Sequence, residues 1–283
     1  MRDSITIKNF PPKNKAIALI DILGFSDYLL KDKIALQTIV DKLVNYFYTC
    51  STYFPKWIIN HDYNEYAQKG VELNTIYISD SILLYLDFKN NKNISSSQEI
   101  DSLSYAVSFM TSLCLNYALP IRGAISYGEC IISEADNIFI GKPIAEAHKF
   151  EKLQDWAGVI LTPTAEYELE KENVNGWLVK YGVPVKKSFC KNRFKTAKKE
   201  FIAINWPISE ARYPKSEKKD YANKISEITG WPVLYGKSRQ EVSQLVSTYK
   251  LSDKKNNIKF RNTFNFWEKY CPQEFVLPSL KGK

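Results

Sequence analysis

The beginning of the chain combines a continuous apolar run with a segment of helical periodicity. Residues 15–21 (KAIALID) are apolar almost throughout and close on a carboxylate, Asp21. Such a run is typical of a buried strand that ends at an edge of a sheet. After Gly24, apolar residues recur at three- and four-residue spacing and predict a long amphipathic helix; they are Leu36, Ile39, Val40, Leu43, Val44 and Phe47.

Two further apolar runs predict a β-hairpin. The runs 73–78 and 81–86 are rich in β-forming residues and flank the dipeptide Ser79-Asp80. Asp and Ser are common in tight turns, so this pair predicts a turn with an acidic residue at its tip.

A second helix and a strand complete the pattern. After a polar loop at 90–97, helical periodicity returns at Leu103, Ala106, Val107, Met110, Cys114 and Tyr117. Pro120 ends this helix, and 121–126 predicts a strand. The order β-α-β-β-α-β predicts a ferredoxin-like α+β core, with an antiparallel sheet and helices on one face.

The rest of the chain predicts additional elements around this core. Helices are expected at 144–153 and 163–169, and strands at 159–161, 177–181 and 201–206. From residue 209 the composition becomes polar and basic, with expected helices at 221–228 and 240–249. These patterns predict a catalytic domain over 1–208 and a basic, mainly helical C-terminal appendage over 209–283.

Composition narrows the class of protein. Hydrophobic residues make up 45% and charged residues 25%, as in globular chains. No apolar run approaches the roughly 18–20 residues of a membrane span, and the start lacks the apolar core of a signal peptide. We therefore expect a cytoplasmic protein without a membrane partner. Five scattered cysteines without a C-x-x-C pair, and only two histidines, disfavour a zinc site, a disulfide framework and a Ser-His-Asp triad.

The net charge of +8 has two interpretations. One is a basic face that binds nucleic acid, and the other is a site for a polyanionic small molecule with the surplus lysines in solvent. Lysines are only mildly concentrated, at 186–199, 215–224 and 249–259. Because most charge runs are solvated surface, we expect no stable nucleic-acid partner.

The candidate chemistry centres on Asp21 and Asp80. A strand end and the tip of an adjacent hairpin become neighbours in a β-α-β-β sheet, although they are far apart in the sequence. Carboxylates are suitable ligands for Mg²⁺, and two metal ions can activate a ribose 3′-hydroxyl and neutralise charge on phosphates. The segment 22–26 lies between strand and helix, where backbone N–H groups can bind phosphate. Taken singly, Asp21 is better explained as a strand-end cap and Asp80 as a turn former; only their combined placement favours the metal site.

Four motifs in this chain resemble those of class III nucleotidyl cyclases, over roughly residues 15–206. They are Asp21-Ile-Leu-Gly-Phe-Ser26, Ile76-Tyr-Ile-Ser-Asp80-Ser81, Arg122-Gly-Ala-Ile-Ser-Tyr-Gly128-Glu129 and Gly141-Lys-Pro-Ile-Ala145-Glu-Ala-His-Lys149-Phe-Glu151. Each motif is weak alone, but all four occur in the family's order. The resemblance implies the conversion of a nucleoside triphosphate to a 3′,5′-cyclic monophosphate and pyrophosphate.

The resemblance also implies roles for individual residues. Two Mg²⁺ or Mn²⁺ ions per active site would be held by Asp21, Ile22 and Asp80. Substrate would be bound by Ile22, Leu23, Gly24, Phe25, Ser26, Ile76, Tyr77 and Ile138. Catalytic cations would be Arg122, Lys149 and Lys186, and an ion pair that stabilises the fold is an equally good interpretation of Arg122. In this family the site lies between two catalytic domains, which implies a homodimer with active sites at the interface.

Departures from the family pattern narrow the range of substrates that we expect. Ile76 and Ile138 stand where adenylate and guanylate cyclases have polar base-recognising residues, so discrimination of purines should be lost. With the stretch RGAISYG at 122–128 and the closing segment Ala203-Ile-Asn-Trp-Pro207, the chain is similar to the pyrimidine cyclases of bacterial Pycsar antiphage systems, whose product activates a separate effector. Of the two pyrimidine triphosphates, we expect UTP rather than CTP to be the main substrate.

Other departures leave alternatives open. Ala145 and Lys149 replace the family's Asn and Arg, and Arg122, Lys142, Lys186 or Lys187 could compensate. The alternatives are a conventional adenylate or guanylate cyclase and a catalytically inactive cyclase-like domain that senses nucleotides.

Overall fold

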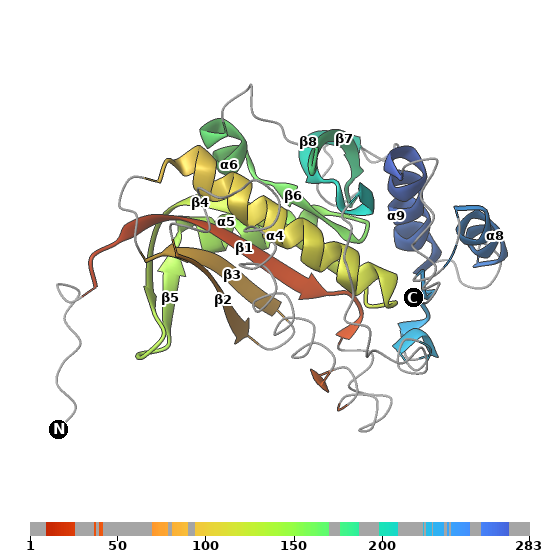
Figure 1. Cartoon of the computed structure of the whole chain (residues 1–283), viewed down its shortest axis with the longest axis horizontal. Coiled ribbons are helices and arrows are strands. Elements are labelled where there is room, and N and C mark those ends of the chain that lie inside the picture. The colour runs from red at the N-terminus through yellow and green to blue at the C-terminus, as the bar shows by residue number, and fades with distance from the viewer. Residues whose placement is uncertain are drawn as a thin grey trace, which may run out of the picture.

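The structure is a computed structural model that describes residues 10–25, 37, 40–41, 70–78, 81–89, 94–169, 176–186, 198–208, 223, 225–227, 229–234, 237, 239–249 and 256–271. These residues form an eight-stranded sheet with the order β2-β3-β1-β4-β6-β8-β7, and β5 pairs with β4 outside this path. Figure 1 shows α4 lying across one face of the sheet.

The centre of the sheet matches the predicted ferredoxin-like order. Its strands are β1 (Lys13–Ile22), β2 (Val71–Ile78), β3 (Ser81–Phe88) and β4 (Ile121–Ser133). Each is antiparallel to its neighbours in the order β2-β3-β1-β4, and this spatial order confirms the β-α-β-β-α-β prediction. Of the predicted first helix, Gln37, Val40 and Asp41 are described, and all three are helical.

Strand β1 is central because its apolar run is buried on both faces. Residues from Ala16 to Ile20 are at most 5% exposed, and β1 is paired on both sides, with β3 and with β4. A run without polar alternation is expected for a strand covered on both faces.

Helix α4 (Ser96–Asn116) begins earlier than the periodicity predicted. Ser95 and Gln98 form a capping box: the Ser95 side chain accepts the Gln98 N–H, and the Gln98 side chain accepts the Ser95 N–H. The polar residues at 96–97, predicted as loop, are therefore the first helical turn. The helix ends before Ala118, which has a φ of 63°.

Outside this core the sheet becomes mixed. Strands β5 (Ile138–Gly141), β6 (Gly158–Leu161), β7 (Leu178–Pro184) and β8 (Lys198–Ile204) extend it, with helices α5 (Lys142–Leu153) and α6 (Pro163–Glu168) and a short 3-10 turn at Trp206–Ile208. Strand β6 is parallel to β4, unlike the other pairs. Strand β5 was not among the elements predicted.

Helix α5 contacts the face of the sheet opposite α4. The Ser126 hydroxyl on β4 donates to Glu146 on α5 at 2.7 Å, whereas the phenol of the next residue, Tyr127, interacts electrostatically with Glu99 on α4. Successive side chains of a strand point to opposite faces. Because Arg122 shares the face of Ser126, it also points toward α5.

The C-terminal part contains α8 (Arg239–Tyr249) and α9 (Asn256–Tyr270), the second of which was not predicted. Helix α9 packs on the core of the sheet through its aromatic side chains. Phe266 is fully buried, and its ring centroid lies 4.9 Å from that of Trp156 and 4.8 Å from that of Tyr181. The Tyr270 hydroxyl donates to the Lys180 carbonyl at 2.9 Å. The boundary at residue 208 stays a prediction, but α9 shares one hydrophobic cluster with the core.

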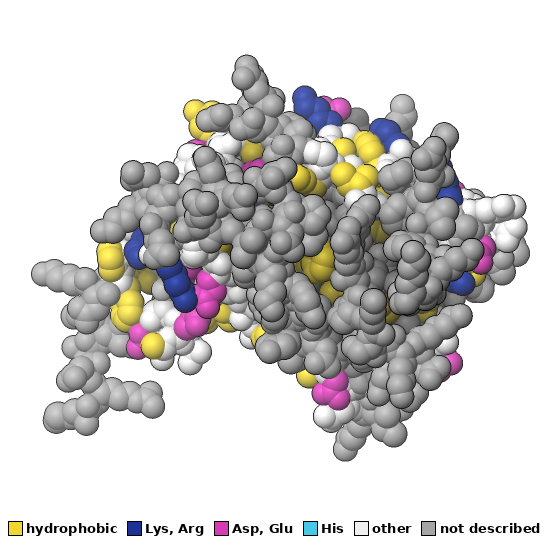
Figure 2. Space-filling model, viewed as in Figure 1, with side chains coloured by type: hydrophobic (Ala, Val, Ile, Leu, Met, Phe, Trp, Pro, Cys, Tyr) yellow, Lys and Arg dark blue, Asp and Glu magenta, His cyan; other side chains and the backbone are white. Residues whose placement is uncertain are grey.

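Charged side chains on the surface are mixed in sign. Lys15 pairs with Asp87 and Lys89 pairs with Glu72, each at 2.7 Å. On the face shown in Figure 2, the coloured basic side chains lie beside acidic ones. None of the helices in the described part of the chain is long and apolar enough to span a membrane.

Glu99 on α4 is a buried carboxyl group whose ionisation opposes folding. It is 7% exposed, and its Oε1 accepts the Ala16 N–H at 3.2 Å. Burial raises its pKa from 4.5 to about 7, although Lys15 and the Ala16 hydrogen bond act in the opposite direction. The folded state therefore holds the proton more tightly than the unfolded state, so this group's stabilisation is present below pH 4.5 and is lost as pH rises to 7.

We expect Glu99→Gln to be more stable than the parent at pH 8, by up to about 3 kcal/mol, since it keeps an acceptor and removes the buried charge. The gain should disappear near pH 4. Urea unfolding at pH 4, 6 and 8 measures it, with the exposed Glu129→Gln as control. An unchanged pH dependence in Glu99→Gln would contradict this account.

Candidate active site

The site begins at the C-terminal end of β1. There Asp21 is paired on one side with Ser81, the first residue of β3, and on the other with Arg122 on β4. Ser81 also pairs with Ile78, the last residue of β2. Asp80 and Ser26 lie outside the described residues, but the hairpin strands that flank Asp80 end beside Asp21.

The turn after β1 supplies fewer free backbone donors than the sequence suggested. Ile22 continues the ladder opposite Ile121, and the Leu23 N–H donates to the Pro120 carbonyl at 2.9 Å. Gly24 has a φ of 81°, a conformation that glycine adopts without steric penalty. Phe25 is helical and buried. The Leu23 N–H is thus committed within the fold, which removes it from the expected phosphate donors.

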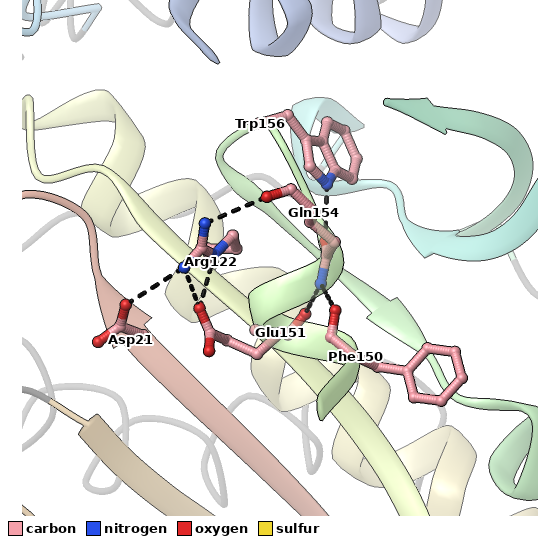
Figure 3. Close-up of polar contacts among 7 residues, drawn as sticks. Asp21, Arg122, Phe150, Glu151, Gln154 and Trp156 are labelled. Atoms are coloured by element: carbon pink, nitrogen blue, oxygen red, sulfur yellow. Dashed lines mark hydrogen bonds and ion pairs between the residues drawn. The ribbon is translucent and has the colours of Figure 1, made fainter. Parts of the chain in front are cut away.

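Arg122 is held in a buried network next to Asp21, as Figure 3 shows. Its Nε donates to Glu151 Oε1 at 2.6 Å, and its Nη2 forms an ion pair with the same carboxylate. Its Nη1 donates to the Gln154 carbonyl at 3.1 Å. The Arg122 Nη2 lies 3.6 Å from Asp21 Oδ2, so the contact with Asp21 is the longest of the four.

The loop between α5 and β6 is fixed around this arginine. Gln154 is fully buried, and its amide donates to the carbonyls of Gly123 and Phe150 at 2.7 and 3.0 Å. Its side-chain oxygen accepts the Trp156 indole N–H at 2.7 Å (Figure 3). Every polar atom of the Gln154 side chain is therefore used to position the loop that faces Arg122.

Two lysines extend the positive charge at this end of the sheet. Lys186 follows β7, where its N–H donates to the Leu153 carbonyl at 2.9 Å, and Lys259 lies on α9. Both are half-buried. Burial, and then the neighbouring Arg122, lowers the pKa of each ammonium, and the two lysines interact unfavourably as well. Asp21 is among the carboxylates that act on Lys259.

Lys149 lies elsewhere on α5. Pro143, Ala147 and Glu151 are the buried residues of this helix, whereas Ala145 and Lys149 are exposed. Residues four apart on a helix share a face, so Ala145 and Lys149 form one exposed surface. This surface does not face the Arg122 network in the same chain.

Three residues were expected to contact the nucleotide base: Ile76, Tyr77 and Ile138. They lie at two different ends of the sheet. Ile76 is half-buried and Tyr77 is 47% exposed, and both are near the end of β2 that lies beside Asp21. Ile138 is on β5 and pairs with Ser133, at the other end of β4 from Arg122. At about 3.4 Å per residue, these ends of β4 are on the order of 30 Å apart. The chain by itself therefore does not bring Ile138 to Asp21.

Asp21 is suited to bind a divalent cation. Its carboxylate offers hard oxygen ligands, and its side chain is 21% exposed. The adjacent Arg122 is neutralised mainly by Glu151, which is closer to it than Asp21 is, so the arginine leaves Asp21 able to accept a metal. The Asp21 end of the sheet thus combines an oxygen ligand for a metal with two half-buried ammonium groups, an arrangement that can bind a metal–phosphate complex.

Three residues of the site, Glu151, Gln154 and Lys259, were not predicted from the sequence. Glu151 was within a quoted motif, and its place four residues after Ala147 on a helix could have indicated an inward-facing charge. Lys259 carried no such signal, because nothing in the local sequence links it to a strand more than two hundred residues earlier.

No protein-family model matches the chain, and no curated protein does. Two solved structures of a bacterial light-regulated adenylyl cyclase are similar to it: one at 16% identity and a TM-score of 0.41 over 80% of this chain and 60% of that chain, the other at 14% and 0.40 over 80% and 59%.

A class III adenylyl cyclase-like ATP-binding protein from Pseudomonas aeruginosa is similar at 13% identity and a TM-score of 0.37, over 60% of this chain and 38% of that chain. The matched part spans about 60% of the two light-regulated proteins and less of the third.

Proposed function

We propose that this protein is a metal-dependent nucleotidyl cyclase that converts a pyrimidine nucleoside triphosphate, UTP in preference to CTP, to the 3′,5′-cyclic monophosphate and pyrophosphate. The observation that carries the proposal is the position of Asp21. It is the penultimate residue of the central strand and pairs with Ser81, the residue that follows Asp80, while Arg122, Lys186 and Lys259 place positive charge at the same end of the sheet.

In this proposal Asp21 and Asp80 hold Mg²⁺ or Mn²⁺, two ions per site. The bound ions supply charge that activates the ribose 3′-hydroxyl and neutralises the leaving pyrophosphate. Glu151 fixes Arg122, and Arg122 in turn orients the Asp21 carboxylate through the 3.6 Å ion pair. Lys186 binds phosphate oxygens, whose negative charge compensates its burial.

The preference for a pyrimidine is inferred from the apolar side chains at the base-recognising positions. Ile76 and Ile138 cannot form the hydrogen bonds that select adenine or guanine, and the partly exposed Tyr77 offers a ring for stacking and a hydroxyl group. The positions of Ile138 and Lys149, away from Asp21 in the same chain, are compatible with a site completed by a second chain in a homodimer. As in the cyclases its motifs resemble, the product would act on a separate effector in antiphage defence.

The experiment is incubation of the protein with ATP, GTP, CTP and UTP separately, with Mg²⁺ or Mn²⁺, and chromatographic resolution of the products. We expect cyclic UMP as the main product, less cyclic CMP, and at least about tenfold less purine product, the factor that 1.4 kcal/mol of lost base contacts would give. EDTA should abolish turnover. Cyclic AMP or cyclic GMP as the main product would contradict the pyrimidine assignment and leave a conventional cyclase.

A second candidate function, a catalytically inactive nucleotide sensor, is favoured by one observation. Ala145 lies on the exposed face of α5. The cyclases whose motifs this chain resembles have an asparagine at this position, and alanine cannot donate a hydrogen bond to a transition state as asparagine can. Saturable binding of a nucleoside triphosphate without cyclic product, with both metals supplied, would support the sensor.

A further inference from the structure

Helix α9 is anchored next to the Asp21 end of the sheet by specific polar contacts. The Thr263 hydroxyl accepts the Ala157 N–H, and the Asn262 amide donates to the Asp155 carbonyl, each at 2.8 Å. Thr263 also donates to the Lys259 carbonyl at 2.8 Å. These bonds connect α9 with the same α5–β6 loop that binds Arg122 through Gln154. Figure 1 shows α9 beside the end of the sheet formed by β7 and β8.

Within this anchored helix Lys259 has an unusual environment. Its side chain is half-buried, and no carboxylate of the described residues lies within 4.0 Å of its ammonium group. The charged groups that act on it come from several elements: Arg122 on β4 and Lys186 after β7 repel it, and Asp155, Asp21 and Glu151 attract it without forming an ion pair with it.

Such a placement is unfavourable in the absence of an anion. A partly desolvated ammonium group loses hydration, and a guanidinium and a second ammonium nearby add repulsion. Of the attracting carboxylates, Glu151 is already paired with Arg122, and Asp21 is the proposed metal ligand. A polyphosphate at the Asp21 end would supply several negative charges and acceptor oxygens at once.

We propose that Lys259 is a substrate-binding residue of the active site, where it contacts the phosphate chain of the nucleotide together with Lys186. The C-terminal helix α9 would then be part of the catalytic unit rather than an appendage to it. This inference rests on the proposed function for the identity of the substrate, but the chemistry it requires is only that of a linear polyphosphate.

The test uses inorganic tripolyphosphate without metal, titrated calorimetrically into the full-length protein, and steady-state kinetics with UTP and Mn²⁺. Lys259→Gln should weaken tripolyphosphate binding at least about tenfold and raise KM more than it lowers kcat, since one charge-assisted hydrogen bond is lost. Lys259→Arg should keep binding within about threefold of the parent, because it keeps the charge.

The matched control is Arg261→Gln, which removes one positive charge from the exposed side of the same helix. It should bind tripolyphosphate as the parent does. Lys259→Gln removes an unfavourable charge, so its unfolding temperature should not fall. A parent that does not bind tripolyphosphate, or equal binding by Lys259→Gln and the parent, would overturn the inference.

The inference and the proposed function can fail separately. Turnover of UTP with undiminished binding by Lys259→Gln refutes only the role of Lys259. Loss of binding in Lys259→Gln, in a protein that forms no cyclic nucleotide, refutes the cyclase and leaves a polyphosphate site.

Discussion

Asp21→Asn should abolish cyclic nucleotide formation, with a loss of at least about 10³-fold in kcat, because a neutral amide is a poor ligand for Mg²⁺ and several kcal/mol of transition-state charge stabilisation would be lost. The substitution keeps the size of the side chain and a hydrogen-bond acceptor for Arg122, whose main partner is Glu151. We therefore expect the fold to be unaffected. Product formation by chromatography and Mn²⁺ binding by electron paramagnetic resonance measure the two effects.

Two further variants test whether the effect of Asp21→Asn is specific to the metal site. Asp136→Asn, in the turn between β4 and β5, removes a carboxylate that accepts a hydrogen bond from Ser133 and should leave turnover unchanged. Asp80→Asn should reproduce the loss seen in Asp21→Asn, if both residues hold the metals. Near-normal turnover in either Asp21→Asn or Asp80→Asn would contradict the assignment of these two residues as ligands of two metal ions.

Glu151→Ala should destabilise the protein by about 3–5 kcal/mol, because it leaves the buried Arg122 guanidinium without its main counter-ion. Arg122 is 5% exposed and Glu151 is 2% exposed, so water cannot readily replace the lost partner. In the described part of the chain, the remaining hydrogen-bond and ion-pair partners of Arg122 are the Gln154 carbonyl and Asp21, the latter at 3.6 Å. Urea-induced unfolding of the variant and the parent gives the difference in free energy.

The double variant Arg122→Met/Glu151→Leu tests what else the arginine does. Replacing both charges by apolar side chains of similar size should recover most of the stability lost in Glu151→Ala. If the refolded double variant also regains turnover, Arg122 serves the fold alone. If turnover stays low in a stable protein, Arg122 also acts on Asp21 or the substrate. Lys152→Ala is a control at an exposed position of α5, the helix that carries Glu151. It should change neither the stability nor the turnover.

Local patterns were sufficient for the central elements of the fold. The continuous apolar run of β1, the two runs of the β2–β3 hairpin and the periodicity of α4 each gave an element of the right type, because burial on one or both faces leaves a period in the sequence. The start of α4 was placed too late, since Ser95 caps a first turn of polar residues. Strand β5 and helix α9 were missed: β5 has four residues, and α9 carries aromatic residues of low helix propensity that become buried only through tertiary contacts, such as those of Phe266 with Trp156 and Tyr181.

The sequence by itself determined the ferredoxin-like order of the core and the placement of Asp21 at the end of a buried strand, since both follow from spacing along the chain. Only the tertiary structure decided that Arg122 is paired with Glu151, that the Leu23 N–H is already bonded to Pro120, and that Lys259 from the last helix lies near Asp21. Contacts between segments so distant in the chain depend on packing of whole elements, which no local period encodes.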